Sequence, residues 1–214
     1  MPQLSFNLIW TEKLKVFKVF RTTKKEYFCN MILPIVAFGD PVLRKKGEDI
    51  SKEYSELKTL INNMWETMYG AEGVGLAAPQ IGKSIKLFLV DASPFADEEP
   101  ELEGFKKVFI NPEILEESGE EWQFKEGCLS IPGIRENVKR NENVKIRYFD
   151  EEFSEHIEEF SGLAARIIQH EYDHINGILF TDKINPLKKQ MIKRKLTDIS
   201  KGIVKASYRM RFPK

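Results

Sequence analysis

Apolar residues spaced three and four positions apart predict a helix early in the chain. They fall between positions 57 and 68: Leu57, Leu60, Ile61, Met64, Trp65 and Met68. This spacing places them on one face of a helix, which a folded protein buries. We expect Ser51 or Ser55 to cap the start of this helix, and Gly70 and Gly73 to end it.

Shorter apolar runs predict strands. Residues 87–90, 108–110 and 144–149 are rich in aliphatic and aromatic residues and have the length of strands. Asparagine and proline at 111–112, and the asparagine-rich segment 141–143, are turn formers. We expect them to break the strands beside them.

Two further helices are expected in the second half of the chain. Ser161 can cap the first of them, and Gly177 can end it. Its apolar side contains Leu163, Ile167 and Ile168. The last helix begins at Pro186, because proline suits the first helical turn. Its apolar positions are Leu187, Met191, Leu196, Ile199 and Ile203.

Strands interspersed with three separated helices indicate an α+β fold with a mostly antiparallel sheet. A chain of 214 residues is expected to form one domain with a sizeable core. We assign residues 31–214 to this domain. Residues 1–30 are interpreted as an N-terminal extension, either a start-site artefact or a genuine arm, because Met31 opens a stretch typical of a natural beginning.

The overall charge gives no reason to expect binding to nucleic acid, DNA included, or to a membrane. Lys+Arg and Asp+Glu are 33 each, and no apolar run approaches the roughly 18 residues of a membrane span. The charges are unevenly distributed, however, because residues 186–214 hold ten Lys or Arg against Asp198 alone. This basic segment is either a solvated face or a site for an acidic partner such as RNA.

The residues with the clearest chemical meaning are His170, Glu171 and His174, which form the pattern HExxH. On a helix the two imidazoles lie on one face and can reach one metal ion. The carboxylate of Glu171 then lies close enough to take a proton from water. The chain has three histidines, and we expect the remaining one, His156, in a strand with no metal role.

A catalytic zinc-type site uses three protein ligands, so a third is needed. Known extensions of HExxH take it from downstream, but Phe180 replaces the required histidine and no glutamate occurs in residues 175–214. Cys128, upstream, offers a thiolate, which binds zinc-like ions strongly. The other cysteine is Cys29. Two cysteines so far apart do not suggest a disulfide framework, and this pattern suits a reducing cytosol.

Three separated segments resemble the signature blocks of the peptide deformylase family. They are GVGLAAPQ at 73–80, EGCLS at 126–130 and QHEYDH at 169–174, and they occur in the family's order. The resemblance runs from about Met31 to the last helix. It implies antiparallel sheets around a central metal-binding helix. It also implies a cytoplasmic enzyme that removes the formyl group from N-terminal formyl-methionine of nascent polypeptides.

The resemblance also implies roles for individual residues. Cys128, His170 and His174 would bind one divalent metal ion, with ferrous iron as the native ion and zinc, nickel or cobalt able to replace it. Glu171 would be the general base.

Oxyanion stabilisation is assigned in the same way to the side-chain amide of Gln80 and the backbone N–H of Leu129. Gly75 would pair with the substrate main chain, and Arg135 would hold a substrate carbonyl. The apolar walls of the methionine pocket are expected at Val74 and Ile167.

Because this substrate emerges from ribosomes, the ribosome is a partner that would suit the basic last helix. We hypothesise that five of its cations bind ribosomal RNA, namely Lys188, Lys189, Lys193, Arg194 and Lys195.

Two rival interpretations remain open. A metallopeptidase could use the same HExxH, although it would need a third ligand of a kind that the chain lacks downstream. An inactive binding module would use the metal structurally and would not need Glu171.

Overall fold

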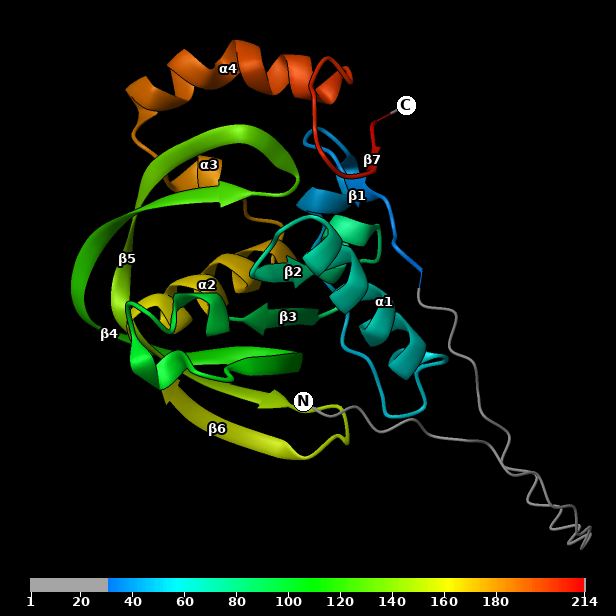
Figure 1. The fold of residues 1–214 in the computed structure, drawn as a ribbon, viewed down its shortest axis with the longest axis vertical. Coiled ribbons are helices and arrows are strands. Elements are labelled where there is room, and N and C mark those ends of the chain that lie inside the picture. The colour runs from blue at the N-terminus through cyan, green and yellow to red at the C-terminus, as the bar shows by residue number, and fades with distance from the viewer. Residues whose placement is uncertain (1–30, 214) are drawn as a thin grey trace, which may run out of the picture.

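The computed structural model describes residues 31–213 and has an α+β architecture (Figure 1). The expected N-terminal extension, residues 1–30, lies outside the described residues, and so does Cys29. Within residues 31–213, no helix has the length and apolar character that a membrane span requires. The predicted combination of helices with a mostly antiparallel sheet is confirmed.

A five-stranded antiparallel sheet forms the framework, in the order β2-β3-β4-β5-β6. Its strands are β2 (Gly75–Ala77), β3 (Leu87–Asp91), β4 (Lys106–Cys128), β5 (Ile131–Phe149) and β6 (Glu155–Phe160). Figure 1 shows β4 and β5 as long, curved strands that pass around α2 and reach the side of the molecule below α4. This curvature brings the end of β4 close to the residues that follow β2, because the Gln80 Nε2 lies 3.5 Å from the Cys128 Sγ.

Two strands continue through positions where we expected breaks. β4 passes through Asn111 and Pro112, and β5 passes through residues 141–143. The pairing register shifts at both places, which identifies β-bulges. Asn111 has a φ of 49°, and its side chain hydrogen-bonds to the backbone N–H and C=O of Ile50 at 2.9 and 2.7 Å. The prediction was wrong because strand pairing outweighed the local turn preference.

A second, two-stranded sheet joins the beginning and the end of the described chain. β1 (Ile35–Val36) pairs in parallel with β7 (Met210–Arg211). Four short 3-10 helices lie in the connections: η1 (Pro41–Arg44), η2 (Ala78–Ile81), η3 (Ser93–Phe95) and η4 (Pro100–Leu102).

The first predicted helix is confirmed as α1 (Leu57–Gly70). Most of its predicted apolar face is buried: Leu60, Ile61, Met64, Trp65 and Met68. The predicted cap was wrong, because the helix begins after Glu56, which has a φ of 58° and makes no side-chain cap bond. Two successive turns, Ser51 to Tyr54 and Tyr54 to Leu57, keep both expected serines ahead of the helix.

The helix that carries the HExxH pattern is α2 (Gly162–Ile175), and it is buried along most of its length. Ser161 occupies the N-cap position as predicted but makes no cap bond with its side chain. The carboxylate of Glu99 accepts a hydrogen bond from the Leu163 N–H instead, at 3.1 and 3.2 Å. Gly177, with a φ of 73°, follows the helix end as expected.

Two helices complete the fold, α3 (Phe180–Lys183) and α4 (Pro186–Ser200). Pro186 starts α4 as predicted, and the Asn185 side chain caps it by accepting from the Leu187 N–H at 2.9 Å. The helix stops at Ser200, so the predicted extension to Ile203 was wrong. Its buried positions are Ile192, Leu196 and Ile199, whereas Leu187 and Met191 are exposed. The helix therefore contacts the rest of the molecule through one narrow stripe.

Candidate metal and catalytic site

Three potential metal ligands converge where the end of β4 meets α2. Cys128 is the last residue of β4, and His170 and His174 lie one turn apart on α2. One ligand atom from each of these residues lies within 4.8 Å of the other two. The Cys128 Sγ is 3.2 Å from the His174 Nε2. Cys128 is far from the two histidines in the sequence and lies on a different element. The curvature of the paired strands β4 and β5 brings it to them (Figure 1).

Glu126 sets the orientation of the first imidazole. Its carboxylate lies 2.8 Å from the His170 Nδ1, so Nε2 is the ring nitrogen left for a metal. Burial alone would raise the pKa of Glu126, but hydrogen bonds from His170 and Arg140 lower it well below its usual range. Glu126 therefore stays ionised and acts as a fixed acceptor behind His170.

Arg140 links the Glu126 carboxylate to Asp173 of α2. Its guanidinium donates to Glu126 through Nε at 2.7 Å and through a terminal nitrogen at 3.0 Å. The other terminal nitrogen donates to Asp173 at 2.6 Å. Arg166 donates a further bond to Glu126 at 3.1 Å. This buried network fixes α2 against β4 and β5, and Asp173 is committed to it.

The two imidazoles differ in their proton affinity. Burial, followed by the charge of His170, lowers the pKa of His174 well below its usual range, so this ring is neutral. Burial opposes protonation of His170, but its hydrogen bonds to Cys128 and Glu126 raise its pKa well above the usual value. A metal bound through Nε2 would require this ring nitrogen to be unprotonated. With two ring nitrogens and a sulfur directed at one point, these residues fit a zinc-like or ferrous ion.

Glu171 is buried beside the potential ligands. Its side chain is 4% exposed, and its Oε2 has no hydrogen-bond partner among residues 31–213. Burial raises the pKa of Glu171 to about 7, while the charge of His170 opposes this rise. A carboxyl group that changes protonation near neutral pH and keeps one oxygen unpaired is suited to move a proton.

Gly75 leaves room for this carboxylate. A Cβ at Gly75 would clash with the Glu171 Oε1 and lie 2.8 Å from its Cδ, so no side chain fits there. Gly75 also belongs to β2, which contributes to the wall of the cleft described below. The Glu171 carboxylate therefore packs directly on the backbone of β2.

This contact predicts that Gly75→Ala displaces the carboxylate and lowers kcat/KM by about 10²-fold for any reaction in which Glu171 moves a proton. The matched control is Gly70→Ala, where a Cβ would meet only the Ile32 Cδ1, at 3.4 Å. Steady-state kinetics on both purified variants check the prediction. An alanine at position 75 with wild-type kinetics would show that Glu171 does not need its present place.

Gln80 points its amide nitrogen at the cysteine. The side chain is 1% exposed, and its Oε1 accepts a hydrogen bond from the Ala77 N–H at 2.7 Å. Because that partner is a donor, the other amide atom must be Nε2, and it lies 3.5 Å from the Cys128 Sγ. The oxygen therefore holds the loop while the nitrogen remains a donor beside the potential ligands.

A cleft with a volume of about 940 Å³ opens over these residues. Its lining includes all six further residues assigned from the sequence or resemblance: Val74, Gly75, Gln80, Leu129, Arg135 and Ile167. Leu129 lies in the short connection between β4 and β5. Arg135 is exposed and has no acidic partner within the described residues. His156 lies in β6, as expected of a strand residue, and stacks on Tyr148 of β5.

Sequence reasoning missed part of the site. Glu126 stands two residues before Cys128 and could have been recognised as a carboxylate partner for a ligating histidine. Arg140 and Arg166 carried no such signal, because their role depends on how β5 and α2 approach each other. Tyr208, near the chain end, also lines the cleft and was likewise missed.

The fold and the site together are those of a metal-dependent hydrolase. Comparisons with known proteins identify the family. The family model for polypeptide deformylase matches residues 32–190, and the chain belongs to the peptide deformylase family.

Individual relatives agree. The peptide deformylase of Christiangramia forsetii is 60% identical over 190 residues, which cover 86% of this chain and 97% of the relative. That of Flavobacterium psychrophilum is 59% identical over 188 residues, or 85% and 97% of the two chains. The crystal structure of a peptide deformylase from Legionella pneumophila has a TM-score of 0.70 and 41% identity, and the match covers 80% of this chain and 97% of that one.

Proposed function

We propose that Glu171 is the general base of a deformylation reaction carried out in this cleft. As a member of the peptide deformylase family, the protein is a hydrolase that removes the formyl group from the N-terminus of nascent peptides. Hydrolysis of that amide releases formate. The observation that carries the assignment of roles is the convergence of Cys128, His170 and His174 beside the buried Glu171 carboxylate.

Family members are metalloenzymes, and Cys128, His170 and His174 are the residues that would hold the ion between the end of β4 and α2. When bound there, a divalent ion lowers the pKa of water and polarises the formyl carbonyl. We propose ferrous iron as the native ion. A thiolate with two imidazoles also suits zinc, nickel and cobalt.

Glu171 would move the proton in both halves of the reaction. Its Oε2, which has no partner within residues 31–213, would accept a proton from the attacking water. The same carboxyl group would then deliver that proton to the amine as formate departs. General acid–base help of this kind contributes about 10²–10⁴-fold to a rate.

Gln80 and Leu129 would stabilise the negative charge that develops on the formyl oxygen. The Gln80 Nε2 is a donor fixed by the bond from Ala77 to its Oε1, so it needs no reorganisation during the reaction. The backbone N–H of Leu129 is the second proposed donor. One such donor typically contributes about 10²–10³-fold.

The remainder of the cleft would bind the peptide. Gly75 would pair with the substrate main chain at the edge of β2, and Arg135 would hold a substrate carbonyl. Val74 and Ile167, which line the cleft and pack against the same apolar cluster, would form walls for the methionine side chain.

Formate release distinguishes this proposal from its rivals. The metal-loaded protein should release formate from a formyl-methionyl peptide and should leave the matching acetyl-methionyl peptide and internal peptide bonds intact. Cleavage of internal bonds would favour a peptidase. A metal-loaded protein without turnover on any of these substrates would favour a binding module.

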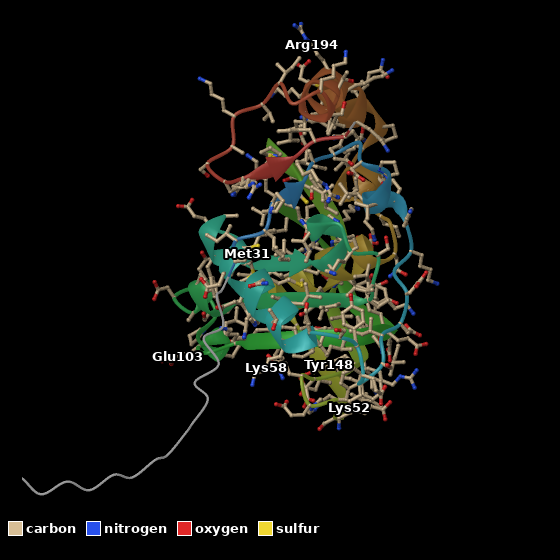
Figure 2. All side chains as sticks on the ribbon, turned by 90° about the vertical axis from the view of Figure 1, so that its right-hand side faces the viewer. Met31, Lys52, Lys58, Glu103, Tyr148 and Arg194 are labelled. Carbon is tan, nitrogen blue, oxygen red and sulfur yellow. The ribbon has the colours of Figure 1, made fainter. Side chains whose placement is uncertain are left out.

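We also propose that α4 binds ribosomal RNA. Lys188, Lys193, Arg194 and Lys195 are exposed and have no acidic partner within the described residues, while Lys189 pairs with Asp182. Figure 2 shows Arg194 at the outer end of the molecule, opposite Lys52 and Lys58. Such a surface suits phosphate contacts, which weaken with added salt.

Reversing charges on α4 tests this proposal. Lys193→Glu with Arg194→Glu should reduce co-sedimentation with ribosomes at low salt and leave hydrolysis of a short formyl peptide unchanged. The matched control, Lys52→Glu with Lys58→Glu, should keep wild-type co-sedimentation. Equal binding by both double variants would exclude α4 as the contact.

We propose that residues 31–214 act as a single catalytic domain in the cytoplasm, with residues 1–30 outside it. Support comes from the family match, which begins at residue 32. Cys128 forms no disulfide within residues 31–213, which suits a reducing compartment.

A further inference from the structure

The end of the chain contributes to the cleft. Lys205, Ala206, Ser207 and Tyr208 line the same cavity as Glu171 and Gln80. These four residues follow α4 and lie beyond residues 32–190, the part of the chain that matches the family model. One wall of the substrate cleft is therefore built by a segment outside that match.

This segment is held on both sides of Tyr208. Before it, Val204 packs against the apolar cluster that contains Ile131 and Ile134. After it, β7 pairs with β1: the Ile35 N–H donates to the Arg209 C=O at 2.9 Å, and the Ala37 N–H donates to the Arg211 C=O at 2.8 Å. Tyr208 is thus carried by anchored backbone.

Tyr208 touches the connection that carries a proposed catalytic donor. Its hydroxyl donates to the Leu129 C=O at 2.7 Å. The next carbonyl, that of Ser130, accepts a hydrogen bond at 2.9 Å from the N–H of Phe38, which is the second residue after β1. Both carbonyls of the two-residue connection between β4 and β5 are therefore held from the β1–β7 side, and the orientation of Leu129 depends on these bonds.

We propose that Tyr208 is a positioning residue for deformylation, which fixes the Leu129 backbone so that its N–H faces the formyl oxygen. This inference rests on the proposed role of Leu129. A donor contributes most when it is fixed before charge develops. The Tyr208 hydroxyl should therefore affect the transition state more than the bound substrate.

Tyr208→Phe removes the hydroxyl and keeps the ring. We expect kcat to fall about 3- to 10-fold, the range for one neutral hydrogen bond, with KM and bound metal unchanged. Tyr69→Phe is the matched control, because that hydroxyl also makes a 2.7 Å bond, to Asp91, away from the cleft. Its kcat should equal that of the wild type.

The outcomes separate this role from plain stabilisation. A wild-type kcat in Tyr208→Phe would overturn the proposal, and so would a loss of kcat that merely follows lost metal or an equal loss in Tyr69→Phe. Since all values are measured relative to the wild-type rate of formate release, failure here leaves the proposed function intact. Failure of the proposed function would instead appear as an inactive wild type.

Discussion

Replacing Glu171 with glutamine should abolish most of the activity without harming the fold. We expect Glu171→Gln to lower kcat for formate release by about 10²–10⁴-fold, because the amide cannot take the proton from water. The protein should be at least as stable as the wild type. A neutral amide costs less to bury than a carboxylate, and this side chain is 4% exposed.

Formate release, metal content and urea denaturation on the same preparation check this expectation. Glu116→Gln, an exposed residue on β4, makes the same chemical change away from the cleft and should leave all three unchanged. Full activity in Glu171→Gln with metal bound would remove Glu171 from the mechanism and would revive the interpretation as a structural metal site.

Loss of the Arg140 guanidinium should have the largest effect on stability. Arg140 is 4% exposed and bonds both Glu126 and Asp173 at 2.6–3.0 Å. Arg140→Met leaves these two buried carboxylates without their shared cation. Breaking a buried pair in this way costs about 3–5 kcal/mol, so the free energy of unfolding should fall by that amount.

The neighbouring residue offers a control. Lys139 is exposed, and its ammonium is 4.0 Å from Glu121, so Lys139→Met should cost about 1 kcal/mol or less. Urea denaturation of both variants, in the same metal-loaded state, measures the difference. Arg140→Lys keeps a charge, so its loss in free energy of unfolding should lie between the other two. This variant still tests the network if Arg140→Met does not fold. Similar small losses in all three would mean that the network contributes little to the fold.

The sequence predicted those elements whose local pattern agrees with their tertiary environment. The stripe from Leu60 to Met68 is buried as expected, because α1 packs through one face only. Predictions failed where partners elsewhere decide the outcome. The bulge at Asn111 depends on Ile50 and on the paired strand, and Glu99 caps α2 in place of Ser161. No local pattern contains that information.

In the candidate site, too, local sequence predicts some features and contacts between distant segments decide the others. HExxH placed two imidazoles on one helix face without any tertiary knowledge, since helical geometry alone does so. Cys128 was identified as the candidate third ligand by its thiolate chemistry, and the resemblance supported it, but no single segment encodes the approach of β4 to α2 that brings it there. The roles of Arg140 and Tyr208 lay beyond both, because each residue acts through a contact between distant parts of the chain.

Every proposed role in the cleft depends on one metal ion held by Cys128, His170 and His174. Anomalous diffraction at the metal absorption edge, on crystals of protein purified without oxygen, tests it most directly. We expect a single strong peak about 2.0–2.3 Å from the Cys128 Sγ and from one nitrogen of each histidine. A metal peak bonded to other residues, with these three atoms left unbound, would rule out this metal site.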